Sequence, residues 1–88
     1  MSLTQQKLTH IKIEAFGAIE RQLPVDLNLQ CESEIQVTEV LNQLLFIYPN
    51  IQHMLERCAC AIGEDIISRQ NVLNQDSTLV LLSPVAGG

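Results

Sequence analysis

The stretch that decides the fold is residues 25–50, VDLNLQCESEIQVTEVLNQLLFIYPN. Its first part, residues 25–32, alternates apolar and polar side chains. This alternation predicts a strand with one face on a core and the other in water, because successive side chains of a strand point to opposite faces. The residues expected to face the core are Val25, Leu27, Leu29 and Cys31.

The second part of the stretch has the periodicity of a helix. From Val37 to Tyr48, apolar residues recur at the i, i+3, i+4, i+7 and i+8 spacing of a single helix face. Pro49 is expected to end this helix, and Asn50 can cap a short second one. The apolar residues of the second helix are Ile51, Met54 and Leu55. The stretch therefore predicts a strand followed by one main amphipathic helix.

A second alternating segment, residues 8–16, precedes this stretch and predicts another strand. Between the two strands, residues 17–24 begin with Gly17 and end with Pro24. Glycine and proline favour turns, so the strands are expected to form a hairpin with a long connection. One side of the first strand would carry Leu8, His10, Lys12, Glu14 and Phe16, and the other Thr9, Ile11, Ile13 and Ala15.

The C-terminal part predicts a second hairpin and a central strand. Residues 58–62 are small and apolar, residues 63–65 are typical of a turn, and residues 66–67 form a short extended segment. Residues 79–82 are a continuous apolar run, which favours a strand buried on both sides in the middle of a sheet, and Pro84 ends it. The order of elements predicts an α+β fold, with a mixed sheet and one main helix packed on one face.

Length and composition limit the classes of function. The 88 residues suit one domain, predicted over residues 1–83, followed by residues 84–88 as a flexible tail. Hydrophobic residues make up 47% of the chain, which is enough for a core. The formal net charge of −5 would repel a phosphate backbone, so a basic protein surface is expected as the partner and nucleic acid is not. No apolar run is long enough for a membrane span or a signal peptide, so the expected location is cytoplasmic.

The cysteines are Cys31, Cys58 and Cys60. An odd number without paired CxxC motifs favours buried structural thiols in a reducing compartment over a disulfide framework. Cys58 and Cys60 could bind a soft metal ion, but neither histidine has metal-ligand spacing to them, so no metal site is expected. The sequence contains no Ser, His and Asp grouping and no phosphate-binding glycine loop, so catalysis by the chain alone is not expected.

The last five residues, PVAGG, follow the predicted last strand directly. Gly87 and Gly88 lack Cβ atoms, so their backbone can pass through a channel too narrow for side chains. Fully extended, five residues reach roughly 16 Å, far enough to deliver the Gly88 carboxylate into another protein's active site. An ATP-using partner could convert this carboxylate to an acyl adenylate, from which a sulfur nucleophile would make a thiocarboxylate. A terminal Gly-Gly also occurs without function, and its place after a central strand is what makes it informative.

Four segments carry a resemblance to a known family. They are IKIEAFG (residues 11–17) leading to Glu20-Arg21, VTEVL (37–41), AIGE (61–64) and PVAGG (84–88). With these segments the chain resembles the family of the molybdopterin synthase small subunit and the thiamine sulfur carriers, whose fold is the ubiquitin-like β-grasp. It departs from the family at residues 74–77, where an Asp-Gly-Asp-like loop is usual, and at Ser83, where a second proline is common.

The resemblance implies a specific chemistry for the tail. In the family the terminal glycine is adenylated by an ATP-dependent enzyme, thiocarboxylated, and inserted into the synthase large subunit, where it supplies the dithiolene sulfurs of molybdopterin. On this chain the reacting residue would be Gly88 and the flexible approach Gly87. The partners would be the adenylating enzyme and the large subunit, with ATP used by the former and no cofactor bound by the chain itself. The docking surface is expected on the sheet near Leu81, Phe16 and the tail.

Three further hypotheses stay open from the sequence. Related carriers with the same tail supply sulfur to thiamine, cysteine or siderophore pathways. A β-grasp interaction domain would use its tail only for docking, without acyl chemistry. A protein modifier would join its terminal glycine to a lysine through an isopeptide bond.

Overall fold

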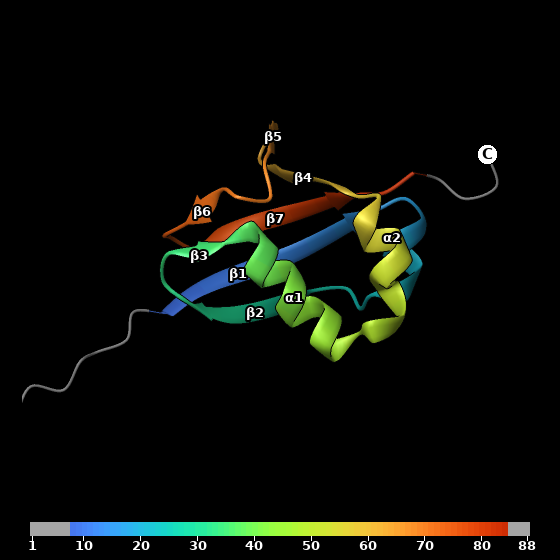
Figure 1. The fold of residues 1–88 in the computed structure, drawn as a ribbon, viewed down its shortest axis with the longest axis horizontal. Helices are drawn as coiled ribbons and strands as arrows, with labels where there is room; N and C mark the ends of the chain where they lie inside the picture. The colour runs from blue at the N-terminus through green and yellow to red at the C-terminus, as the bar shows by residue number, and fades with distance from the viewer. Residues whose placement is uncertain (1–7, 85–88) are drawn as a thin grey trace, which may run out of the picture.

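The structure, a computed structural model, describes residues 8–84 (Figure 1). A five-stranded sheet has the strand order β2-β1-β7-β4-β5, and β3 and β6 form a separate two-stranded sheet. The strands are β1 (Leu8–Phe16), β2 (Leu27–Glu32), β3 (Ile35–Gln36), β4 (Ala59–Ile62), β5 (Asp65–Ile67), β6 (Val72–Leu73) and β7 (Ser77–Leu82). The helices are η1 (Ala18–Gln22), α1 (Val37–Ile47), η2 (Pro49–Ile51) and α2 (Gln52–Glu56), of which η1 and η2 are 3-10 turns.

The main sheet is mixed, as the sequence predicted. Strand β1 pairs antiparallel with β2 and parallel with β7, and β4 pairs antiparallel with both β7 and β5. Helix α1 crosses one face of this sheet, with α2 beside it (Figure 1). The α+β class, both hairpins and the single main helix are therefore confirmed.

The core lies between the sheet and α1. Ile11, Ile13, Leu79 and Leu81 come from the two central strands, and Val37, Val40, Leu41 and Leu44 come from the predicted helix stripe. A capping box begins α1, because the Gln36 amide donates to the Glu39 carboxylate at 3.1 Å and the Gln36 side chain accepts a bond from the third residue of the helix. Apolar periodicity and local capping thus agree on where the helix begins.

Three details of the sequence prediction were wrong. Val25 is 88% exposed instead of facing the core, because β2 begins only at Leu27, after a turn in which Asp26 has φ 59°. Strand β7 is central but is not buried on both faces: Leu79 and Leu81 are buried, whereas Leu82 is 37% exposed, because α1 covers only one face. Asn50 makes no capping bond, since it lies within η2, which leads directly into α2.

The pairing of β3 with β6 was not predicted, because two residues per strand are too few to produce a detectable alternation. It places residues 69–71 against the start of α1. The Val37 amide donates to the Asn71 carbonyl at 2.9 Å, and the Thr38 amide and hydroxyl both donate to the Arg69 carbonyl at 2.9 Å. Three donors at the helix start are satisfied in this way, so the segment serves as an extended N-terminal cap.

The Arg69 side chain joins this segment to α2. Its Nη2 atom donates to the carbonyls of Leu55 and Cys58 at 2.7 and 2.8 Å, at the end of that helix. We expect Arg69→Leu to lower the free energy of unfolding by about 2 kcal/mol, because it leaves two carbonyls without a charged donor. Urea unfolding followed by circular dichroism measures this change. Arg57→Leu is the control, since Arg57 is exposed; equal stability of the two variants would contradict the prediction.

Candidate functional site

The site lies at the end of the sheet where the chain leaves β7. Because β1 and β7 are parallel, both strands end at the same edge, and Phe16 is in register with Leu82 (Figure 1). The last described residue, Pro84, lies two residues beyond that pair. The parallel pairing therefore brings together Phe16, Leu82 and the segment that precedes the C-terminal glycines.

Four hydrogen bonds hold residues 83–84 against the turn after β1. The Ser83 amide and hydroxyl both donate to the Phe16 carbonyl, at 3.0 and 2.9 Å. The same hydroxyl oxygen accepts from the Ile19 amide at 3.0 Å, and the Ala18 amide donates to the Pro84 carbonyl at 3.3 Å. We call this set of contacts the Ser83 latch. It continues the attachment of the chain beyond the end of the β ladder.

Gly17 makes the latch possible. Its φ of 87° and ψ of −152° lie in a region that is open essentially to glycine alone. A Cβ atom at this position would also overlap the Ser83 carbonyl oxygen. Both the backbone conformation and the close approach of Ser83 thus require glycine, which accounts for this residue within the IKIEAFG segment.

An apolar patch adjoins the latch on the face of the sheet opposite α1. It comprises Phe16, Ala59, Ile66, Val80 and Leu82, which we call the end patch. Phe16, Ile66 and Leu82 are 49%, 66% and 37% exposed. No described element covers this surface. Of the two residues predicted for docking, Phe16 is in this patch, but Leu81 is not: it is fully buried, because it alternates with Leu82 and points towards the core.

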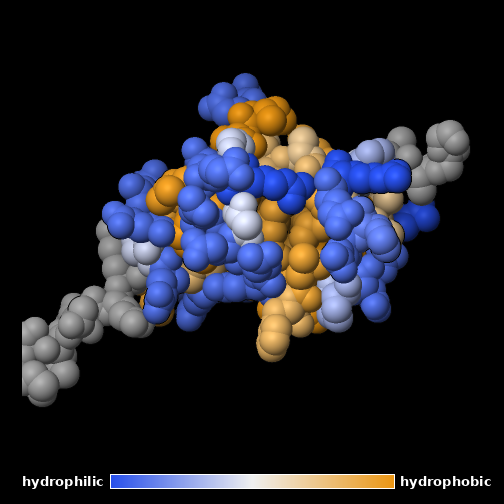
Figure 2. All heavy atoms as spheres, viewed as in Figure 1, coloured by the Kyte–Doolittle hydropathy of each residue, from blue (hydrophilic) through white to orange (hydrophobic). Residues whose placement is uncertain are grey.

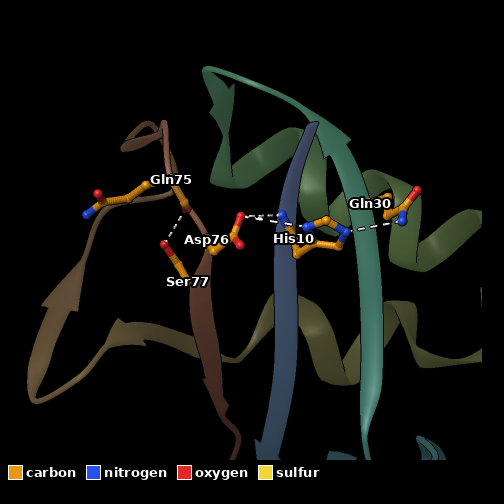
Figure 3. Close-up of polar contacts among 5 residues, drawn as sticks. All are labelled: His10, Gln30, Gln75, Asp76 and Ser77. Carbon is orange, nitrogen blue, oxygen red and sulfur yellow. Dashed lines mark hydrogen bonds and ion pairs between the residues drawn. The ribbon is translucent and has the colours of Figure 1, made fainter. Parts of the chain in front are cut away.

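The other half of this face is polar (Figure 3). Asp76 accepts a hydrogen bond from the His10 amide at 3.0 Å, and its carboxylate lies 3.7 Å from the His10 ring. On the neighbouring strand, the Gln30 side-chain amide lies 3.2 Å from the other ring nitrogen of His10. Asp76 thereby holds the loop 74–77, which departs from the family pattern, against β1. The polar half contains no exposed aromatic anchor among the described residues, so the end patch is the better-suited protein-binding surface.

The opposite face of the molecule carries the helices (Figure 2). Hydrophilic side chains cover most of it, and hydrophobic ones form a band beside α1. At the end of α1, Phe46 and Ile47 are 90% and 51% exposed. These two residues belong to α1, which lies on the face of the sheet opposite the end patch.

All three cysteines are buried and free, which confirms that they pack as small core residues. Burial raises the pKa of each thiol; for Cys58 the nearby Cys60 adds to the rise, while Arg69 opposes it for Cys58 and Cys60. The Cys58 thiol lies 3.3 Å from the Met54 carbonyl. Within residues 8–84, no group of three or more metal-ligating side chains converges.

The raised thiol pKa values predict slow modification and a defined pH dependence. At pH 8, we expect iodoacetamide to react with the folded chain about 100-fold more slowly than with the chain unfolded in urea. In the folded chain only a small fraction of each thiol is ionised, and the buried sulfur atoms are not accessible to the reagent. The stability that the protonated thiols contribute is complete below the usual thiol pKa and is lost as the pH rises through the raised values. Mass spectrometry measures the modification; rapid labelling of folded Cys58 or Cys60 would argue for accessible, reactive thiols.

Gly87 and Gly88, the residues predicted to carry the chemistry, lie outside the described residues, and their roles stay predictions. The Ser83 latch was missed from the sequence, where Ser83 stood out only as a departure from a proline. Among residues 8–84, no helix is long and apolar enough to cross a membrane.

Solved structures with the same fold define the class of protein. SAMP1, the small archaeal modifier protein 1 of Haloferax volcanii, matches with a TM-score of 0.76 at 12% identity, covering 90% of this chain and 99% of its own. Urm1 from Trypanosoma brucei matches with a TM-score of 0.54 at 16% identity, covering 96% and 100%. The fold is accordingly the ubiquitin-like β-grasp.

The chain belongs to the ThiS family, whose model matches residues 14–88, and it is a ubiquitin-like sulfur carrier of that type. A structure of subunits 1 and 2 of the molybdopterin-converting factor from Helicobacter pylori also matches. Its TM-score is 0.59 at 25% identity, covering 91% of this chain and 100% of that one. No curated protein sequence matches the chain at a significant level.

Proposed function

We propose that this protein carries sulfur as a thiocarboxylate on Gly88 and donates it in molybdopterin biosynthesis. The observation that carries the proposal is the ThiS family match, which extends over residues 14–88 and so includes both terminal glycines. The Helicobacter pylori complex of molybdopterin-converting factor subunits supports a large-subunit partner for this chain. The protein would then be the small subunit of a sulfurtransferase and not a catalyst by itself.

The proposed loading takes two steps, both on a partner enzyme. The Gly88 carboxylate attacks the α-phosphorus of ATP, which forms an acyl adenylate and releases pyrophosphate. Hydrosulfide then attacks the acyl carbon, and AMP leaves with the bonding electrons. With hydrosulfide the product is the thiocarboxylic acid, which loses a proton to give the thiocarboxylate.

The proposed donation reverses the role of the terminal group. The thiocarboxylate sulfur displaces an oxygen leaving group from an electrophilic carbon of the acceptor, which takes the bonding electrons, and forms an acyl thioester. Water then cleaves the acyl–sulfur bond, which restores the Gly88 carboxylate and leaves the sulfur on the acceptor. The domain contributes by binding the partner, which converts an encounter with dilute sulfide into a reaction between groups held close together.

The end patch is the surface that we assign to partner binding. It adjoins the segment that leads to Gly88, and it combines an exposed aromatic side chain with exposed aliphatic ones. The chain's net charge of −5 adds attraction to a basic partner surface at a distance. An adenylating enzyme and a synthase large subunit would use the same patch in turn, because both must reach the same carboxylate.

The test is an intact mass measurement after incubation with ATP, a sulfide source and the adenylating enzyme of the same genome. Replacement of one oxygen by sulfur raises the mass by about 16 Da, and fragmentation must place the change on Gly88 and not on an oxidised Met or Cys. We expect the modified chain to convert the cyclic pterin precursor when the synthase large subunit is added. An unchanged terminus, under conditions in which the enzyme activates a known carrier, would favour a β-grasp interaction domain without acyl chemistry.

The same reaction distinguishes a molybdopterin carrier from carriers of different pathways and from a protein modifier. A thiocarboxylate that the molybdopterin large subunit does not consume would assign the carrier to a thiamine, cysteine or siderophore pathway. The fold of small archaeal modifier proteins makes a modifier role worth testing as well. A modifier would give conjugates in which Gly88 is joined to a lysine, and these survive thiol reagents, whereas acyl thioesters do not.

A further inference from the structure

The pairing of β1 with β7 does not explain why residues 83 and 84 are held in place. The register ends at the pair of Phe16 and Leu82. Beyond it, the chain is retained by the Ser83 latch, and two of its four hydrogen bonds require the Ser83 hydroxyl. This hydroxyl donates to the Phe16 carbonyl and accepts from the Ile19 amide, so it joins the end of β1 to η1.

The Ser83 latch includes a hydrogen bond to a residue of the core. Ile19 is fully buried, and its amide is one of the partners of the hydroxyl. At Gly17, a Cβ atom would overlap Ser83, so the turn fits closely around that residue. The position of Ser83 is thus set by contacts with the packed interior as well as by the pairing of β1 with β7. Pro84 follows, with its ring restricting one more backbone angle.

We propose that the Ser83 hydroxyl is a positioning group for sulfur-carrier activation, because it fixes the place from which residues 85–88 extend towards the partner. The inference rests on the proposed function, in which Gly88 must enter the adenylating enzyme while the end patch binds its surface. Four residues span at most about 14 Å, so the point of departure determines which positions the carboxylate can reach.

Loss of the hydroxyl should affect binding more than chemistry. With two of the four latch bonds lost, residues 83 and 84 are held less firmly, so a longer segment must be ordered when the enzyme binds the carboxylate. The effective concentration of that carboxylate at the active site then falls. Once the carboxylate is in place, its reaction with ATP depends on the enzyme. The expected effect is therefore a higher KM for the carrier with an unchanged kcat.

The test is carrier-dependent exchange of labelled pyrophosphate into ATP, catalysed by the adenylating enzyme of the same genome. We expect Ser83→Ala to raise the KM for the carrier about 3- to 10-fold at constant kcat. The matched control is Ser77→Ala on the same strand. The Ser77 hydroxyl also bonds to a carbonyl, that of Gln75 at 2.8 Å, but it lies at the opposite end of β7, so its removal should leave KM unchanged.

Amide hydrogen exchange gives a second measurement that needs no partner. In Ser83→Ala, exchange should accelerate at Ala18, Ile19 and position 83, while the central pairs of β1 and β7 keep their protection. An unchanged KM in Ser83→Ala would overturn the positioning role. A raised KM with loss of protection throughout the sheet would also overturn it, because the hydroxyl would then act on stability.

The outcome for the wild-type chain separates this inference from the function on which it rests. If the wild-type chain supports no exchange with an enzyme that activates a known carrier, the proposed function fails and the positioning role fails with it. If the wild-type chain is active and Ser83→Ala has the same KM, only the positioning role is overturned.

Discussion

Adding one alanine after Gly88, or deleting Gly88, is expected to abolish sulfur transfer and to leave thermal unfolding unchanged. In either variant the reacting carboxylate moves by one residue, about 3.5 Å, relative to the partner's active site. Since a misplacement of about 1 Å can lower a rate 100-fold, we expect a loss of more than 100-fold. The sheet should be unaffected, because β7 ends at Leu82 and the four hydrogen bonds of the Ser83 latch join residues within 16–84.

The measurement pairs thiocarboxylate formation by mass spectrometry with thermal unfolding by circular dichroism. A chain with one alanine added before Met1 is the length control and should transfer sulfur at the wild-type rate. Transfer that survives both changes at the C-terminus would refute the requirement for the Gly88 carboxylate.

The second large effect is expected at Phe16. Phe16→Ala should weaken binding to the adenylating enzyme about 30-fold, because truncation of an aromatic anchor at an interface typically costs about 2 kcal/mol. Phe16 is half exposed in the free protein and lies beside Leu82, next to the departing chain. A partner that covers this side chain can therefore hold the carboxylate at the same time.

Phe46→Ala is the matched control for this prediction. Phe46 is 90% exposed at the end of α1, on the face away from the end patch, so its truncation should leave the affinity within about twofold. Isothermal titration calorimetry measures both affinities, and urea unfolding checks that both variants keep the fold. Equal losses in the two variants would mean that the end patch is not the docking surface.

The sequence predicted the elements that have a long, regular pattern. Residues 8–16 contain enough alternation to specify a strand, and the helix stripe from Val37 specifies both a helix and its buried face. The bounds of β2 could not be predicted, because the turn at Asp26 depends on backbone angles and not on hydrophobicity. The run at residues 79–82 marked a central strand, but an unbroken apolar run does not reveal which of its side chains face outwards.

Contacts between distant residues could not be predicted from periodicity. The Ser83 hydroxyl bonds to Ile19 and Phe16, which precede it in the sequence by 64 and 67 positions. Arg69 bonds to the carbonyls of Cys58 and Leu55, which precede it by 11 and 14 positions. These partners become neighbours only after the sheet and helices have packed. For the candidate site, the sequence therefore supplied Gly87, Gly88 and Phe16 as predictions, whereas the latch and the composition of the end patch required the structure.

The central place of β7 has a consequence for when the carrier can act during its synthesis. Residues 77–82 fill the gap between β1 and β4, and neither of those strands pairs directly with the other. A nascent or prematurely terminated chain that lacks these residues cannot join its two hairpins into one sheet. The glycines that follow β7 are added only after the strand that completes the sheet, so an activating enzyme that recognises both glycines and sheet surface would select finished, folded molecules.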